Sequence, residues 1–247
     1  MKNKYTICSL GIVLIVWKLL TLYFSPLVVP TISSVAKCLL DILTDKKQLS
    51  MIFLTILRLC AGLSLGVAAG LVTGILMGKY KHIYGLAKPL IGLLQTVPPV
   101  SWVVLALVWF GFNGKPTVFI VVTATLPVIA INVSEGIHNV DPHLLEMARL
   151  FQFTQVKQFR YVVFPSILPY FASALRVALG SGWKIAVMGE VLTTSDGIGG
   201  MIKLARLNVE PENIIAWSAI IVILFYGFDL ILGRAIAFGK GEPHGEH

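Results

Sequence analysis

The sequence predicts an all-α membrane protein with about six transmembrane helices. Apolar residues make up 56% of the 247 residues, only 13% are Asp, Glu, Lys or Arg, and the mean hydropathy is +0.84. A soluble domain carries roughly 25% charged residues, because water must solvate its surface. This chain could not cover itself with polar groups, so we expect lipid to cover part of its surface. Two further observations, the length of its apolar runs and the placement of its basic residues, support the same fold class.

Six apolar runs are long enough, or nearly so, to cross a hydrocarbon core that requires roughly 20 helical residues. They are Tyr5–Phe24, Ile52–Gly78, Leu86–Phe112, Thr117–Val133, Tyr170–Leu192 and Ile214–Phe238. The first begins like a signal peptide but has no A-x-A cleavage site, so we expect a retained span. The third is interrupted by Pro98 and Pro99.

The basic residues favour one side of the membrane. If the N-terminus is cytosolic, the basic turn Lys79–His82 and the polar segment Asp141–Arg160 both lie inside, as the positive-inside rule requires. We therefore expect a multi-pass protein of the cell membrane with both termini in the cytosol. The net charge of +8 does not indicate nucleic-acid binding, because no block of Lys and Arg alternates with aromatic residues.

The cysteines and histidines predict no metal site. Cys8, Cys38 and Cys60 show no CxxC or Cys/His spacing, and the tail Pro243–His247 contains only two His. We expect small buried thiols, with a disulfide at Cys38 left open because that residue falls outside.

The second apolar run contains a ladder of overlapping GxxxG units. Its members recur every four residues: Gly62, Gly66, Gly70, Gly74 and Gly78. In lipid, small residues let two helices approach closely, and this contact replaces the missing hydrophobic drive. The ladder predicts a helix-packing face, whose partner helix lies either in this chain or in a second copy.

The polar segment between the fourth and fifth runs predicts two short helices. Asp141 is a good N-cap and Pro142 is tolerated at the first helical position. Thr154 can cap a second helix, Gln155 to Val162, which we expect to end against Pro165. The residues alone are compatible with an interfacial helix pair or with an element that docks a partner.

The same segment resembles a known family. EMARLFQFTQVKQFRYVVFP resembles the EAA loop of binding-protein-dependent transporter permeases, with Glu146, Ala148 and Pro165 at matching positions. Three positions depart from the family's pattern: Met147, Gln152 and Phe164. Gln152 stands where the family has the Gly that allows a sharp turn.

Three other segments are similar to the nitrate, sulfonate and taurine group of that family. They are TVPPVSWVVLALVWFGFNGKPT (Thr96–Thr117), LRVALGSGWKIAVMGEVL (Leu175–Leu192) and the outer loop SDGIGGMI (Ser195–Ile202). The resemblance implies one permease domain, residues 1–247, with the type I (MetI-like) importer fold and a cytosolic coupling loop at about 141–165. It also implies an inner-membrane location.

The sequence has no G-x-x-x-x-G-K-[ST] loop to cradle ATP phosphates, so we expect another polypeptide to supply the energy. The resemblance implies which partners these are. We expect no enzyme activity and no cofactor in this chain, two ATPase subunits that carry ATP and Mg2+, a second permease subunit in a homodimer, and an external solute-binding protein. The coupling positions implied by the resemblance are Glu146, Ala148, Arg149, Gln152, Thr154, Lys157, Phe159 and Pro165.

The translocation path is predicted from ionisable residues within the apolar runs, which are costly in lipid and therefore functional candidates. Arg176, Lys184 and Glu190 qualify, with Trp102 as an aromatic candidate, while Arg58 suits snorkelling toward the outer side or a structural pair. Lys184 lies among small residues and could favour an anionic solute such as nitrate, a sulfonate or taurine. A salt bridge from Lys184 to another helix, and a non-anionic cargo such as a vitamin precursor, remain alternatives.

Two other functional classes fit less well. An intramembrane enzyme would need a Ser/His, paired Asp or HExxH set within the runs, and none is found, so we expect no catalytic residue. A passive channel or membrane scaffold would explain the glycine ladder but not the EAA-like loop.

Overall fold

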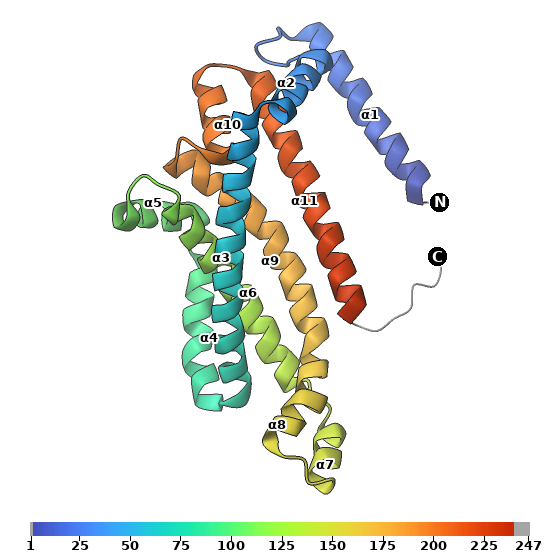
Figure 1. Cartoon of the computed structure of the whole chain (residues 1–247), viewed down its shortest axis with the longest axis vertical. Helices are drawn as coiled ribbons and strands as arrows, with labels where there is room; N and C mark the ends of the chain where they lie inside the picture. Colours follow the sequence, from blue (N-terminus) through green and yellow to red (C-terminus); the bar gives the residue numbers. More distant parts are fainter. Residues whose placement is uncertain (1, 240–247) are drawn as a thin grey trace.

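The computed structural model describes residues 2–239, with side chains for Tyr5, Cys8, Ser9 and residues 11–234. The described chain forms α-helices and one π-helical turn without any strand, which confirms the all-α class (Figure 1). The elements are α1 (Lys2–Tyr23), α2 (Ile32–Thr44), α3 (Lys46–Lys79), α4 (Lys81–Thr96), α5 (Pro99–Phe110), α6 (Lys115–His138), α7 (Pro142–Leu150), α8 (Gln155–Gln158), η1 (Phe159–Val163), α9 (Phe164–Thr193), α10 (Gly197–Leu207) and α11 (Pro211–Gly239). The tail Pro243–His247 lies outside the described residues.

Four helices are long and apolar enough to cross a membrane, namely α3, α6, the continuous helix Gln155–Thr193, and α11. The pair α4 and α5 adds a fifth span if it is counted as one broken crossing. The described apolar part of α1, Gly11–Tyr23, is shorter. The predicted polytopic architecture is therefore confirmed. α1 and the bent pair differ from the other spans, because the described apolar part of α1 is short and the pair is broken.

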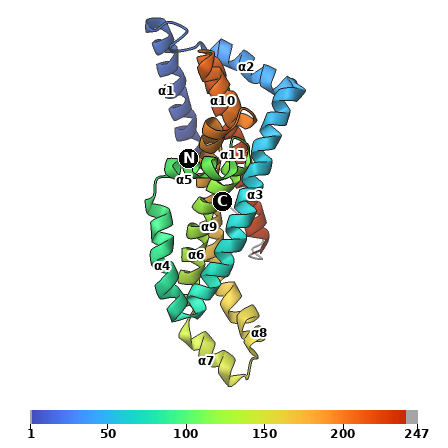
Figure 2. The same cartoon turned by 90° about the vertical axis from the view of Figure 1, so that its left-hand side faces the viewer.

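The third apolar run is not one straight helix. Its two halves, α4 and α5, are bent by 95° at the break between them. Pro98 and Pro99 cause the break, because each lacks an amide donor and restricts the residue before it to extended backbone. Figure 2 shows α5 lying across the bundle, nearly perpendicular to α4.

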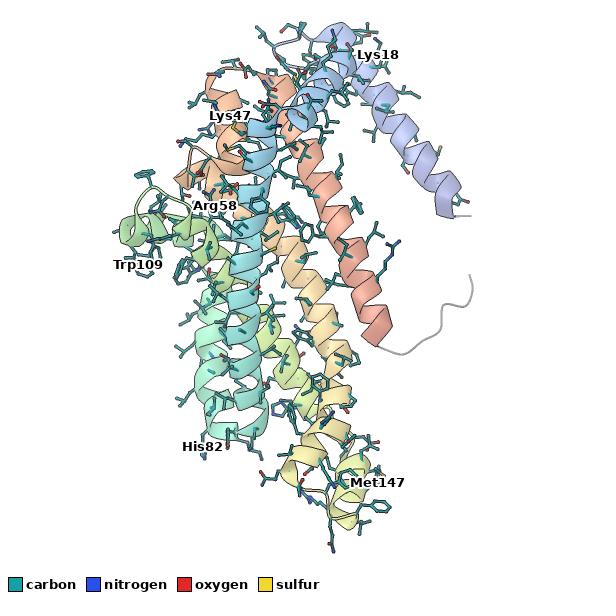
Figure 3. All side chains as sticks on the ribbon, viewed as in Figure 1. Lys18, Lys47, Arg58, His82, Trp109 and Met147 are labelled. Atoms are coloured by element: carbon teal, nitrogen blue, oxygen red, sulfur yellow. The ribbon has the colours of Figure 1, made fainter. Side chains whose placement is uncertain are left out.

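The molecule has two distinct ends (Figure 1). One end carries α2 and α10, and the opposite end carries α7 and α8. The basic turn between α3 and α4 lies toward the end with α7 and α8, as the labels of His82 and Met147 show in Figure 3. Lys18 and Lys47 lie at the other end.

The glycine ladder of α3 packs against α6 in the same chain. A Cβ added at Gly62, Gly66 or Gly70 would stand 2.6–2.8 Å from the Cβ of Val121, Thr125 or Ile129. Gly74 and Gly78 meet Val133 and Ile137 in the same register. Both helices therefore contribute a row with a four-residue step, and a side chain at any of these five glycine positions would force α3 and α6 apart.

The second short helix does not end against Pro165, as the sequence suggested. It continues through the π-helical turn Phe159–Val163 into α9, so that Gln155–Thr193 forms one helix of 39 residues. Pro165 lacks an amide hydrogen and cannot bond a carbonyl of the preceding turn. The wider π turn accommodates this loss, and the Phe164 amide bonds the carbonyl of Phe159, five residues back.

The cysteines also differ from expectation. Cys8 and Cys60 are exposed on helix faces and Cys38 is half-buried, and all three thiols are free. No disulfide therefore joins Cys38 to either of the other two.

Candidate functional site

The end of the molecule that carries α7 and α8 forms a small, ordered unit. Asp141 caps α7, since its carboxylate accepts a hydrogen bond from the His143 amide at 2.9 Å. Thr154 caps α8 by accepting from the Lys157 amide at 3.4 Å. Both predicted caps are therefore present, and the two helices begin where the sequence placed them.

Ala148 holds the unit together from inside. Its side chain is 1% exposed and packs with Val140 and Val162 in a small core that also receives Leu145 and Phe153. A larger residue would push α7 off the start of α9, which explains why a small residue suits this position.

Gln152 ends α7 in the conformation that a glycine would normally adopt. Its φ is 54°, in the left-handed region. The Phe153 amide bonds the carbonyl of Ala148 and the Gln152 amide bonds that of Arg149, both at 2.9 Å. These two bonds form a Schellman motif, a helix end that normally has Gly at this position. The sharp turn is therefore kept although the residue differs.

The outer face of the unit is apolar and exposed. Leu150, Phe151 and Val156 are 83%, 70% and 76% exposed, and Leu144 and Met147 are also exposed. These five residues, which we call the docking face, belong to α7, its C-cap and α8, at the end of the molecule that Met147 marks in Figure 3. An exposed apolar patch of this kind indicates a contact surface for another molecule.

The remaining loop residues surround the docking face. Glu146, Arg149 and Lys157 are exposed, and Glu146 lies 3.9 Å from His143. Phe159 is half-exposed at the start of the π turn, and Pro165 sits in the first turn of α9. All eight residues assigned to coupling thus fall on one contiguous unit.

The four predicted pathway residues do not come together. Trp102 lines a cavity of about 310 Å³ between α4, α5, α6 and α9. Lys184 is exposed on α9, one turn beyond the cavity residue Ser181. Arg176 lies on a different face of α9, where its guanidinium approaches Gly233 of α11.

Glu190, the fourth predicted pathway residue, is fully buried. Its carboxylate accepts hydrogen bonds from Thr55 at 2.7 Å, Arg58 at 2.9 Å and the Gly199 amide at 3.0 Å. Arg58 also pairs with Asp196 at 2.8 Å. Glu190 therefore joins α3, α9 and the start of α10 at the end of the molecule that carries α2 and α10, and these contacts fit a structural role.

Arg58 and Glu190 stand out in the sequence as charged residues within apolar runs, but their pairing and the contribution of Asp196 are not evident from it. One signal could have revealed the pairing. Arg58 lies about six residues from the outer end of its apolar run, and Glu190 lies close to the outer end of another. Opposite charges at similar depth in lipid are expected to pair. The Gly-rich start of α10 completes the site, because a Cβ at Gly197 would collide with the Glu190 carboxylate.

The described chain is thus a bundle of apolar helices with a capped, apolar unit at one end. The comparisons with known proteins identify the family. Residues 66–237 match the model of the binding-protein-dependent transport system inner membrane component. The chain belongs to this family of ABC importer permeases.

Two relatives and one solved structure illustrate the match. The taurine transport system permease protein of Escherichia coli is 27% identical over 98% of this chain and 90% of its own length. The nitrate import permease protein of Synechocystis is 29% identical over 79% of this chain and 70% of its own length. A bacterial ABC transporter involved in alginate import has a chain that aligns with a TM-score of 0.66, at 16% identity and 96% coverage of both chains. The predicted MetI-like permease fold is thereby confirmed.

Proposed function

We propose that two copies of this chain form the membrane path of an ATP-driven importer for a small anionic solute. Residues 1–247 act as one permease domain, and the loop at 141–165 couples it to two separate ATPase subunits. Those subunits supply the ATP and Mg2+ sites, because this sequence has no P-loop and performs no hydrolysis itself. An external binding protein delivers the solute.

The docking face is the observation that carries the coupling role. Leu150, Phe151 and Val156 present exposed apolar side chains at the end of the molecule that carries α7 and α8. Exposure of such side chains to water is unfavourable by about 25 cal/mol per Å², and a partner groove would remove them from water. Glu146, Arg149 and Lys157 lie beside them and would fix the orientation of the contact.

The orientation follows from the same assignment. If the docking face is cytosolic, the basic α3–α4 turn is also cytosolic, as the positive-inside rule requires. α1 then runs outward and α11 runs inward, so the described ends of these helices, Lys2 and Gly239, point toward the cytosolic side of the inner membrane.

The anionic cargo is proposed from relatives and from Lys184. Taurine and nitrate, named for two relatives, both carry an anionic group. Lys184 is exposed on α9, and no carboxylate lies within salt-bridge distance of it in the described chain. The salt bridge considered for Lys184 is thus not formed within the described residues, and its cation is available to an anion.

Affinity purification from the native membrane tests the coupling role. We expect the wild-type chain to recover an ATP-hydrolysing partner, and Leu150→Asp to lose it, because a carboxylate on the docking face cannot be desolvated cheaply. Leu207→Asp is the matched control, since Leu207 is 64% exposed on α10 at the opposite end. Equal recovery of the ATPase by both variants would overturn the proposal.

A further inference from the structure

We propose that a groove between α3 and the long helix Gln155–Thr193 binds an anionic phospholipid of the cytosolic leaflet. Two cavities form this groove, one of about 310 Å³ and one of about 280 Å³. Ile75 and Phe159 line both cavities, so the two adjoin, and together we call them the lipid groove. The choice of leaflet rests on the proposed orientation, while the lipid is a ligand beyond the proposed import function.

The lipid groove follows two helices along their length. On α3 it is lined by Leu71, Ile75 and Lys79, at a four-residue step. On the long helix its lining residues extend from Gln155 to Phe171. At 1.5 Å per residue these two sets span about 12 Å and about 24 Å. Half of a hydrocarbon core is about 15 Å thick, so the lipid groove has the length that an acyl chain and its head group require.

The polarity of the lipid groove changes from one end to the other. The cavity next to α8 is lined by Lys79, Gln155 and Gln158 together with four apolar residues. The other cavity is lined by eight residues, and all of them are apolar. An acyl chain would fill this second cavity and supply the dispersion contacts that an empty cavity lacks. A polar solute would lose its hydration there without gaining a hydrogen bond.

The polar end of the lipid groove suits an anionic head group. Lys79 lies in the last turn of α3, beside the basic turn to α4, and its ammonium lies 5.4 Å from the centre of the Tyr80 ring. Within the described chain, no carboxylate lies within salt-bridge distance of Lys79. The side-chain amides of Gln155 and Gln158 can donate hydrogen bonds to phosphate oxygens. Basic pockets between helices at the cytosolic surface are a recurrent site for anionic lipids.

The π turn shapes the wall between the two cavities. Phe159 and Phe164 are five residues apart, which would place them about 140° apart around an α-helix. Here the Phe164 amide bonds the Phe159 carbonyl, and the two rings are neighbours with centroids 6.5 Å apart. Both side chains are exposed, at 40% and 53%. The π turn thus presents two aromatic rings on one side of the helix, and such turns are frequent at functional sites.

Native mass spectrometry of the full-length chain tests the proposal, because each spectrum reports the number of lipids and of chains in a particle. The purified chain in dodecyl maltoside is titrated with phosphatidylglycerol or with phosphatidylethanolamine. We expect phosphatidylglycerol to be retained at a concentration about fivefold lower, since one lysine favours an anionic lipid by roughly that factor. Glycerol phosphate, which lacks acyl chains, should not displace the bound lipid.

Paired substitutions make the outcome specific to each end of the lipid groove. Lys79→Gln should abolish the preference for phosphatidylglycerol, whereas Lys81→Gln, in the same basic turn but outside both cavity linings, should keep it. Leu71→Trp fills the apolar cavity and should weaken the binding of both lipids severalfold. Val72→Trp is the matched control, because Val72 is 61% exposed on α3 and lines neither cavity.

Equal retention of the two lipids, displacement by glycerol phosphate, or an unchanged preference in Lys79→Gln would overturn the proposal. So would a Leu71→Trp variant that changes the number of chains per particle and not the number of lipids, since the groove would then be a contact between two copies. The assay contains neither an ATPase nor a transported solute, so its failure leaves the docking test unaffected. A failed docking test with lipid retention intact would count against coupling alone.

Discussion

Glu190 connects three helices at the end of the molecule that carries α2 and α10. Its buried carboxylate pairs with Arg58, whose side chain is only 12% exposed. Glu190→Ala would leave that guanidinium without its buried partner, and we expect a loss of about 3–5 kcal/mol in the free energy of unfolding. Asp196 is the other partner of Arg58, and its side chain is 48% exposed. Asp196→Ala should therefore lower the free energy of unfolding by only about 0–1 kcal/mol.

Titration from mild detergent into sodium dodecyl sulfate, followed by circular dichroism, measures both values. Similar losses in the two variants would mean that the exposed and buried carboxylates contribute equally, contrary to the geometry.

Gln152 offers a prediction of opposite sign. An L residue in the left-handed region costs roughly 1–2 kcal/mol, whereas glycine adopts it freely. Gln152→Gly should therefore stabilise the α7–α8 unit by up to about 1 kcal/mol, offset in part by the freedom glycine gains in the unfolded chain. Gln155→Gly, at the first position of α8, should instead destabilise the unit. Hydrogen exchange of the α7 amides is the measurement, and faster exchange in Gln152→Gly would contradict the assignment.

At the scale of the element, α3 and α6 pack closely because the contact face of α3 consists of glycines. A Cβ at Gly70 would stand 2.7 Å from the Cβ of Ile129 and 2.9 Å from the carbonyl oxygen of Leu126. We expect Gly70→Ala to destabilise the protein by about 1–3 kcal/mol in the same detergent titration. At Gly85 in α4, nothing lies within 4 Å of an added Cβ, so Gly85→Ala should stabilise by about 0.5–1 kcal/mol. Two changes of the same sign would refute the close-packing account.

Local features of these elements could be predicted from sequence, while contacts between distant elements could not. Asp141 and Thr154 predict the starts of their helices, because an N-cap residue bonds an amide within three residues of itself. The glycine ladder has a period that is visible in the sequence, but its partner α6 depends on the tertiary fold. The pairing of Arg58 with Glu190 spans 132 residues, so no local pattern contains it.

The continuation of α8 into α9 was missed for a related reason. Pro165 normally marks a helix boundary, and only the π turn before it allows the helix to continue. The expectation that a helix ends near proline depends on that residue alone. The π turn that makes up for the missing amide involves the backbone of several residues, so it is not evident from Pro165 itself. The strong bend at Pro98 and Pro99 was anticipated as an interruption, but its angle of 95° depends on packing against α6 and α9.

At the scale of the whole molecule, the two ends should face opposite compartments. In a cysteine-free parent, Ser33→Cys places a thiol on exposed α2, and His143→Cys places one on exposed α7. We expect a membrane-impermeant maleimide to label only Ser33→Cys on intact cells, and both variants after lysis. Labelling of His143→Cys on intact cells would reverse the orientation and exclude a cytosolic docking face.

The 39-residue helix Gln155–Thr193 connects these two ends without a loop. At 1.5 Å per residue it is a rod of about 58 Å, so a tilt of about 5° at one end displaces the other end by about 5 Å. This displacement is close to the rise of one helical turn, and it requires no hydrogen bond of the helix to break. If a partner binds at α8, such a tilt would carry its movement to Glu190 near the other end of the same helix.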